Sequence, residues 1–174
     1  MRLGRKKQMQ IASTVTAVVI AIAGFTGYTA TTQSSTDSTL EPAAIVRVVD
    51  GDTFVASVNG TEEKIRLIGV DTPESVHPDK SKNTEAGEEA SEYTKSMLQP
   101  GTKVWLEADS QDEDKYNRKL RYVWLQEPTD SNDKEEAKSK MFNAILVEDG
   151  WAEPLKIAPN TKWADLFEEL DEAA

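Results

Sequence analysis

The chain has 174 residues, a formal net charge of −11 at pH 7, a single histidine and no cysteine. This length is enough for one domain of ordinary size with a hydrophobic core. The lack of cysteine excludes disulfides, thiolate catalysis and cysteine-bound zinc, and a single histidine, His77, excludes histidine triads and multi-histidine metal sites. Any catalytic site must be built from carboxylates, arginines, lysines, tyrosines and hydroxyl groups.

The N-terminus has the pattern of an export signal. An uncharged, mostly apolar run over Ile11–Ala30 follows four basic residues, Arg2, Arg5, Lys6 and Lys7. A basic segment before an apolar one is typical of a signal peptide, and a run of this length can also span a bilayer as a helix. We therefore expect residues 1–30 to be either a cleaved signal peptide or a membrane anchor. Either one places the rest of the chain outside the cytoplasm and limits contact with a membrane to this segment.

Residues 31–41 are polar and rich in Ser and Thr, which predicts a linker. The folded domain is expected over residues 42–174, as a monomer.

The domain begins with a pattern of strands and sharp turns. Ala44–Val49, Thr53–Val58 and a run that starts near Ile65 are rich in β-branched and apolar residues. Asp50-Gly51 and Asn59-Gly60 separate them, and such dipeptides are strong hairpin signals. The sequence therefore predicts a three-stranded meander.

Helices and two more strands follow. Thr84–Leu98 is expected to be a helix with an apolar stripe of Ala86, Ala90, Tyr93 and Met97. The remaining expected elements are strands over Lys103–Ala108 and Leu120–Leu125, a charged surface loop over Glu127–Lys140, and helices over Met141–Asp149 and Thr161–Leu170. The order predicts an α+β fold, mainly β: a five-stranded Greek-key barrel of the OB type with about three flanking helices.

The segment Arg66–Glu74 carries the strongest functional pattern. Pro73 ends an apolar strand, and carboxylates stand just before and just after this stop at Asp71 and Glu74. Phosphodiester chemistry needs such a mixture of oxygen ligands for a cation, a carboxylate to handle water, and an arginine for phosphate oxygens. A solvated strand end with scattered charge is the alternative.

Strict strand alternation would place Arg66 and Asp71 on opposite faces. Convergence on one site therefore needs a bend or bulge, for which Gly69 is the natural place.

Five segments in order make the chain resemble the staphylococcal nuclease (thermonuclease) family over about residues 44–163. They are Val49–Thr53, Arg66–Glu74, Glu85–Ala90, Asp114–Arg118 and Asn143–Gly150. The resemblance implies an OB-fold barrel and calcium-dependent hydrolysis of DNA and RNA. It also implies that Asp52, Asp71 and the Thr72 carbonyl bind one Ca²⁺.

In the same resemblance, Glu74 is the general base, and Arg66 and Arg118 bind the scissile phosphate and stabilise its transition state. Lys115 and Tyr116, next to Arg118, would line the substrate groove. One departure concerns the segment 152–160, which has no tyrosine where the family carries tyrosines that contact the nucleotide.

The charge is unusual for a protein that binds polyanions. From Leu40 onward there are 16 basic and 30 acidic residues, and this surplus repels phosphates at long range. The sequence therefore leaves two alternatives to a nuclease open. One is a non-catalytic OB-fold module that binds nucleic acid or a protein, and the other is a surface domain with a purely structural calcium site.

Overall fold

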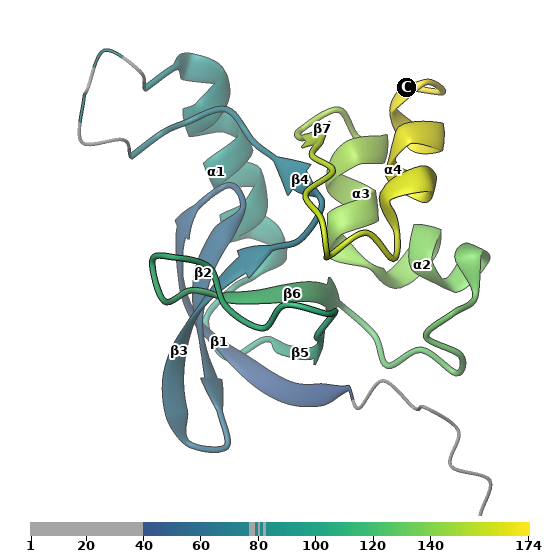
Figure 1. The fold of residues 1–174 in the computed structure, drawn as a ribbon. Coiled ribbons are helices and arrows are strands. Elements are labelled where there is room, and N and C mark those ends of the chain that lie inside the picture. The colour runs from purple at the N-terminus through teal and green to yellow at the C-terminus, as the bar shows by residue number, and fades with distance from the viewer. Residues whose placement is uncertain (1–39, 77–78, 80, 82) are drawn as a thin grey trace, which may run out of the picture. The chain divides into compact units, whose positions relative to one another are not determined.

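The computed structural model describes residues 40–76, 79, 81 and 83–174. Five strands in this range close into a barrel in the order β1-β2-β3-β6-β5 (Figure 1). β3 and β6 pair in parallel, whereas the other neighbours are antiparallel. The strands are β1 (Glu41–Asp50), β2 (Thr53–Val58), β3 (Thr61–Leu67), β5 (Lys103–Glu107) and β6 (Lys119–Trp124). This closed barrel confirms the predicted OB-type fold.

Four helices and a small second sheet surround the barrel. The helices are α1 (Glu85–Met97), α2 (Lys134–Lys140), α3 (Phe142–Glu148) and α4 (Ala164–Asp171). The second sheet pairs β4 (Val70–Asp71) with β7 (Glu153–Pro154) in antiparallel orientation. Glu127–Lys140 is therefore not only a surface loop, as the sequence suggested, because its second half forms α2. Only Ala137 of α2 is buried, and the Asp133 side chain caps its first turn.

Both predicted hairpin turns are present. β2 and β3 pair up to Val58 and Thr61, with Asn59 and Gly60 at φ values of 51° and 84° between them. Such positive angles at both central residues match the tight hairpin turn that Asn-Gly favours. β1 and β2 pair up to Asp50 and Thr53, so that Asp52 lies in the turn.

Helix α1 has almost the predicted bounds, and its buried face differs from the predicted stripe at Ala86. Thr84 is its N-cap, and the Thr84 hydroxyl accepts a hydrogen bond from the Gly87 amide at 3.0 Å. The buried residues are Gly87, Ala90, Ser91 and Thr94, whereas Ala86 is exposed. The expected stripe is therefore wrong at Ala86. The small side chains let α1 approach neighbouring backbone closely. In α1 this close approach decides which face is buried more than apolar periodicity does.

The core fills the barrel and continues under α3 and α4. Trp163, Leu166, Phe167 and Leu170, expected as core residues of the last helix, are all buried. Phe167 contacts Tyr122 of the barrel with ring centres 6.2 Å apart. The C-terminal helix is thereby held against β6.

The expected leader helix lies outside the described residues, as does the predicted linker except for Leu40 and Glu41. No helix within the described ranges combines the length and apolarity needed to cross a bilayer.

Gly69 offers a test of how tightly α4 packs on the barrel. A Cβ atom at Gly69 would lie 2.7 Å from Cε2 of Phe167, and the φ of 78° disfavours any side chain. We expect Gly69→Ala to lower the free energy of unfolding by about 2–4 kcal/mol, from strain and overpacking together. Urea denaturation measures this loss.

Gly60→Ala is the matched control, because Gly60 has a φ of 84° and no atom within 4 Å of a new Cβ. It should cost only the conformational strain, about 1 kcal/mol. Equal losses at the two positions would contradict close packing of Phe167 against Gly69.

Candidate active site

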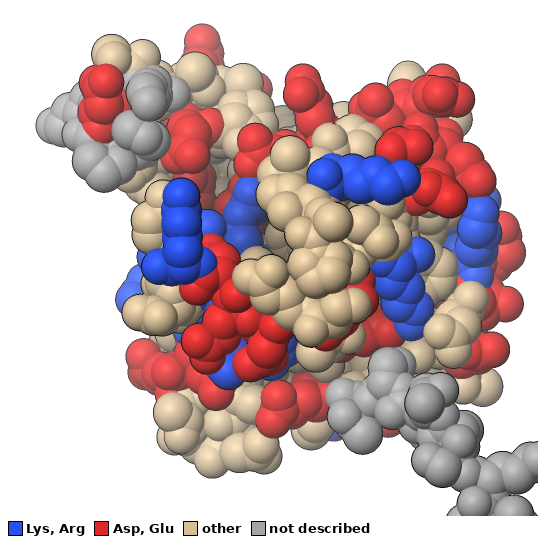
Figure 2. All heavy atoms as spheres, viewed as in Figure 1, with Lys and Arg blue, Asp and Glu red and all other residues tan. Residues whose placement is uncertain are grey.

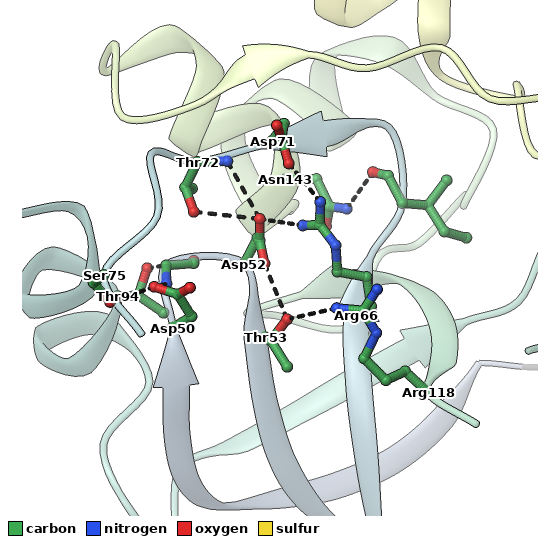
Figure 3. A network of polar contacts seen from close by, with 12 residues as sticks. Asp50, Asp52, Thr53, Arg66, Asp71, Thr72, Ser75, Thr94, Arg118 and Asn143 are labelled. Atoms are coloured by element: carbon green, nitrogen blue, oxygen red, sulfur yellow. Dashed lines mark hydrogen bonds and ion pairs between the residues drawn. The ribbon is translucent and has the colours of Figure 1, made fainter. Parts of the chain in front are cut away.

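A polar cluster forms where the β1–β2 turn, the end of β3 and the region of β4 meet (Figure 3). The strand breaks at Gly69, so that β3 ends at Leu67 and β4 begins at Val70. This bend brings Asp71 to Arg66, with 2.7 Å between Arg66 Nη2 and Asp71 Oδ1. The structure thus confirms the bend that the sequence predicted at Gly69.

Arg66 lies between two carboxylates. Its Nη1 is ion-paired with Asp52 Oδ2, and its Nη2 with Asp71. The Arg66 and Asp52 side chains are only 12% and 10% exposed, whereas Asp71 is 58% exposed. The two carboxylates expected to bind a cation therefore converge on one positive charge, with one of them buried and one open to solvent.

Thr72 and Thr53 complete the surroundings of Asp52. The Thr72 amide and hydroxyl both donate to Asp52 Oδ2 at 3.3 Å, and the Thr53 hydroxyl donates to Oδ1 at 2.9 Å. Burial raises the pKa of Asp52 above its usual range, although Arg66 and these hydrogen bonds act in the opposite direction. A further cation at this carboxylate would favour its ionised form.

The cluster offers oxygen donors, which are the ligand type that a hard cation such as Ca²⁺ takes. Asp52, Asp71 and the Thr72 carbonyl provide oxygen atoms, and both carboxylates already accept the guanidinium of Arg66 as a common cationic partner. In the part of the chain that the structure describes, no group of three or more acidic, histidine or cysteine side chains could hold a metal ion. Since Ca²⁺ takes six to eight oxygen ligands, water would have to fill most of the remaining positions.

Arg118 is held by Asp114, a residue that the sequence analysis did not select. Arg118 Nε lies 2.6 Å from Asp114 Oδ2, and the amides of Tyr116 and Arg118 donate to Oδ1 at 2.8 and 3.0 Å. Burial would raise the pKa of Asp114, but the hydrogen bonds from Arg118 and Tyr116 outweigh it and hold the pKa below its usual range. In the sequence, the spacing of four residues between Asp114 and Arg118 could have indicated this contact.

Thr53 connects the two arginine regions. Arg118 Nη1 approaches the Thr53 hydroxyl at 3.5 Å, and the same hydroxyl donates to Asp52. Figure 3 shows this path from Arg118 through Thr53 to Asp52. Thr53 is 4% exposed. The structure therefore brings Arg118 to the edge of the cluster, although Arg66 lies in β3 and Arg118 in the loop just before β6.

An open cleft of about 380 Å³ adjoins the two arginines. Tyr116, which is 65% exposed, stands at its border, with Lys115 Nζ and Arg118 Cζ at 5.0 and 5.4 Å from the ring centre. Apolar side chains, among them Leu120 and Ile157, form much of the remaining wall. The expected groove residues Lys115 and Tyr116 thus border a real cleft next to Arg66 and Arg118.

The structure does not join the side chain of Glu74 to the cluster. Its side chain is exposed, and its carboxylate makes no hydrogen bond or ion pair to any residue of the described ranges. Its backbone is held, however, since the Thr84 amide donates to the Glu74 carbonyl at 3.0 Å.

Ser75 and Thr94, which were not predicted as site residues, hold the β1–β2 turn next to the cluster. The Ser75 hydroxyl donates to Asp50 Oδ1 at 2.5 Å, and the Thr94 hydroxyl donates to the Gly51 carbonyl at 2.7 Å. Figure 3 shows both contacts on the side of the cluster next to α1. They tie the turn that carries Asp52 to the segment after Asp71 and to α1.

Acidic side chains outnumber basic ones in this protein. In Figure 2 red side chains predominate at the upper edge of the molecule, over α1 and α4. Positive charge available to a phosphate is therefore local and comes from the arginines and Lys115.

Comparison with known proteins identifies the family of this chain. Residues 64–174 match the family described as staphylococcal nuclease homologue. The thermonuclease of Staphylococcus intermedius is 39% identical over 145 residues, covering 82% of this chain and 76% of the relative. The thermonuclease of Staphylococcus hyicus is 38% identical, with 75% and 69% covered. Endonuclease YncB of Bacillus subtilis strain 168 is 33% identical, with 82% and 61% covered. The chain therefore belongs to the family of staphylococcal nuclease homologues.

Proposed function

We propose that this protein is a calcium-dependent nuclease that hydrolyses phosphodiester bonds of DNA and RNA outside the cell. The observation that carries the proposal is the convergence of Asp52 and Asp71 on Arg66, with Arg118 linked to Asp52 through Thr53. Relatives named thermonuclease and endonuclease support the same reaction class. A single-domain monomer with nucleic acid as its substrate accounts for these features.

Asp52, Asp71 and the Thr72 carbonyl are the residues that would hold the cation. When bound, Ca²⁺ supplies positive charge that polarises a phosphate oxygen and favours ionisation of water. Arg66 contacts the same two carboxylates, so an N–H group of Arg66 that turns from a carboxylate to a phosphate oxygen would exchange one anionic partner for another. A guanidinium suits this exchange because its planar fork matches carboxylate and phosphate alike.

Glu74 would accept a proton from water, and the water oxygen would then form a bond to phosphorus. As the ester P–O bond breaks, the leaving oxygen takes up a proton. Arg66 and Arg118 would stabilise the extra negative charge on the phosphoryl oxygens during this step. The exposed position of Glu74 leaves its carboxylate free to turn toward a bound substrate.

The cleft beside the arginines would hold one nucleoside unit. Tyr116 provides an exposed aromatic face, and Leu120 and Ile157 provide apolar contact. Lys115 adds a positive charge for a neighbouring phosphate. The signal or anchor expected over residues 1–30 would bring the domain outside the cytoplasm, either secreted or tethered to the membrane.

The reaction itself is tested with single-stranded DNA and RNA, in calcium and in excess chelator. We expect cleavage in calcium alone, and a rate lower by about 10²- to 10³-fold in Arg118→Ala, since donors aimed at developing charge contribute on this scale. Arg47→Ala, on the exposed face of β1, is the control for loss of one positive charge. A folded, calcium-binding protein without cleavage would favour the non-catalytic OB-fold module instead.

Glu74→Gln tests the general base. It should lower kcat by about 10²- to 10⁴-fold, because proton transfer contributes on this scale. The calcium dissociation constant from calorimetry should change little, since Asp52 and Asp71 remain. Glu85→Gln, an exposed glutamate in the first turn of α1, is the matched control. Turnover near that of the unaltered protein would refute the assignment of Glu74.

Asp114→Asn tests the support of Arg118. A hydrogen bond to a charged group is worth roughly 1.5–3 kcal/mol, so we expect kcat/KM to fall about tenfold or more. The same change in the Arg118→Ala background should have little further effect, because Asp114 acts through Arg118. Glu113→Gln, which loses only the 2.7 Å contact with Lys119, is the control. Equal effects in both backgrounds would contradict this role.

A further inference from the structure

Helix α1 touches the backbone of Glu74 at a point where only glycine fits. A Cβ atom on Gly87 would lie 2.2 Å from the Glu74 carbonyl oxygen, 2.5 Å from its carbonyl carbon and 2.8 Å from the Pro73 carbonyl oxygen. These are backbone atoms, so no rotation of a side chain could relieve the overlap. Glycine within a helix costs about 1 kcal/mol relative to alanine, and at this position it permits direct contact between α1 and Glu74.

The same turn of α1 also bonds to Glu74. The Thr84 amide donates to the Glu74 carbonyl at 3.0 Å, and the Thr84 hydroxyl accepts from the Gly87 amide at 3.0 Å. Thr84 and Gly87 thus form one capped turn that holds the Glu74 backbone by a hydrogen bond and by contact.

Helix α1 is also bonded to the turn that carries Asp52. Thr94, one of the buried residues of α1, donates to the Gly51 carbonyl at 2.7 Å, next to Asp52. Ser75, which follows Glu74, donates to Asp50 in the same turn. One rigid helix therefore spans from the turn that carries Asp52 to the backbone of Glu74.

We propose that Gly87 is a positioning residue for Glu74: by lacking a side chain, it lets α1 seat against the Glu74 backbone and sets where the Glu74 carboxylate meets the reaction centre. This inference rests on the proposed function, in which Glu74 is the general base. The Glu74 carboxylate has no partner among the described residues that could orient it, so its place is set through its main chain.

A methyl group at Gly87 would have to displace one of the two elements in contact. α1 is held by its buried bond from Thr94 to Gly51, whereas Glu74 lies outside any helix or strand. We therefore expect Glu74 to move. A displacement of about 1 Å in a catalytic group can cost on the order of 10²-fold in rate, and the substitution removes none of the groups that would bind cation or phosphate.

The test measures kcat and KM with single-stranded DNA, and calcium affinity by calorimetry, for Gly87→Ala, Glu74→Gln and the double variant. We expect Gly87→Ala to lower kcat by about 10- to 100-fold, with KM and the calcium dissociation constant within about twofold of the unaltered protein. In the Glu74→Gln background the same change should have almost no further effect, because residues that act as a unit are not additive. Additive losses would show a structural role and overturn the proposal.

Ala86→Gly is the matched control, since it weakens the same turn by about 1 kcal/mol at an exposed position without adding an atom. It should leave kcat near that of the unaltered protein. If Gly87→Ala does not fold, Thr84→Ala replaces it, because it loosens the capped turn at a cost of about 1 kcal/mol. Its loss of kcat should likewise vanish in the Glu74→Gln background, and a loss that persists there overturns the proposal.

The two proposals fail separately in this experiment. Near-normal turnover in Glu74→Gln refutes the general base itself. A large loss in Glu74→Gln together with normal turnover in Gly87→Ala refutes only the role of Gly87.

Discussion

The candidate centre depends on one backbone conformation, the positive φ of Gly69. Without that bend, β3 would continue straight and Asp71 would point away from Arg66. With it, the buried Asp52 and the exposed Asp71 share a single guanidinium. The ring of Phe167 occupies the space that a side chain at position 69 would need, so that glycine is required there for packing as well as for the bend. The C-terminal helix is far from the site in sequence, yet its core packing supports the geometry of the polar cluster.

The electrostatics of the cluster explain how an acidic protein can act on a polyanion. Burial of the ionised Asp52 carboxylate costs desolvation free energy. The ion pair with Arg66 and the hydrogen bonds from Thr72 and Thr53 offset part of it. The net charge acts at long range, where salt screens it within about 10 Å. Arg66 and Arg118 act at contact distance, where screening is weak. Local donors can therefore bind a phosphate although the surface as a whole is negative.

Helix α1 connects this cluster to Glu74 through small residues. Gly87 and Thr94 contact backbone at two separate places, and neither contact needs an apolar side chain. A helix that is rich in larger apolar residues on this face could not approach so closely. The composition of α1 thus lowers intrinsic helix stability and allows a close contact with the segment that carries Glu74.

Much of the fold followed from local patterns. Asp50-Gly51 and Asn59-Gly60 marked two hairpin turns, and Asn59 and Gly60 adopt the positive φ angles that few other residue pairs take up readily. Trp163, Leu166, Phe167 and Leu170 marked a core helix through their spacing. Helix α2 escaped detection because only Ala137 of its residues is buried, so that capping and tertiary contacts rather than apolar periodicity stabilise it. The buried face of α1 was misassigned at Ala86 for a similar reason, since small and polar residues carry no hydrophobic signal.

The sequence by itself determined the barrel, the absence of cysteine and multi-histidine chemistry, and the set of carboxylates and arginines available to a reaction. It also indicated Gly69 as the position of the bend, because Arg66 and Asp71 could not otherwise meet. Only the tertiary structure decided that Asp114 holds Arg118, that Thr53 links Arg118 to Asp52, and that Gly87 touches Glu74. The last two of these contacts join separate segments of the chain, and their distances depend on how whole elements pack. Residue type and spacing along the chain do not specify such distances, because packing is set by the core rather than by the site.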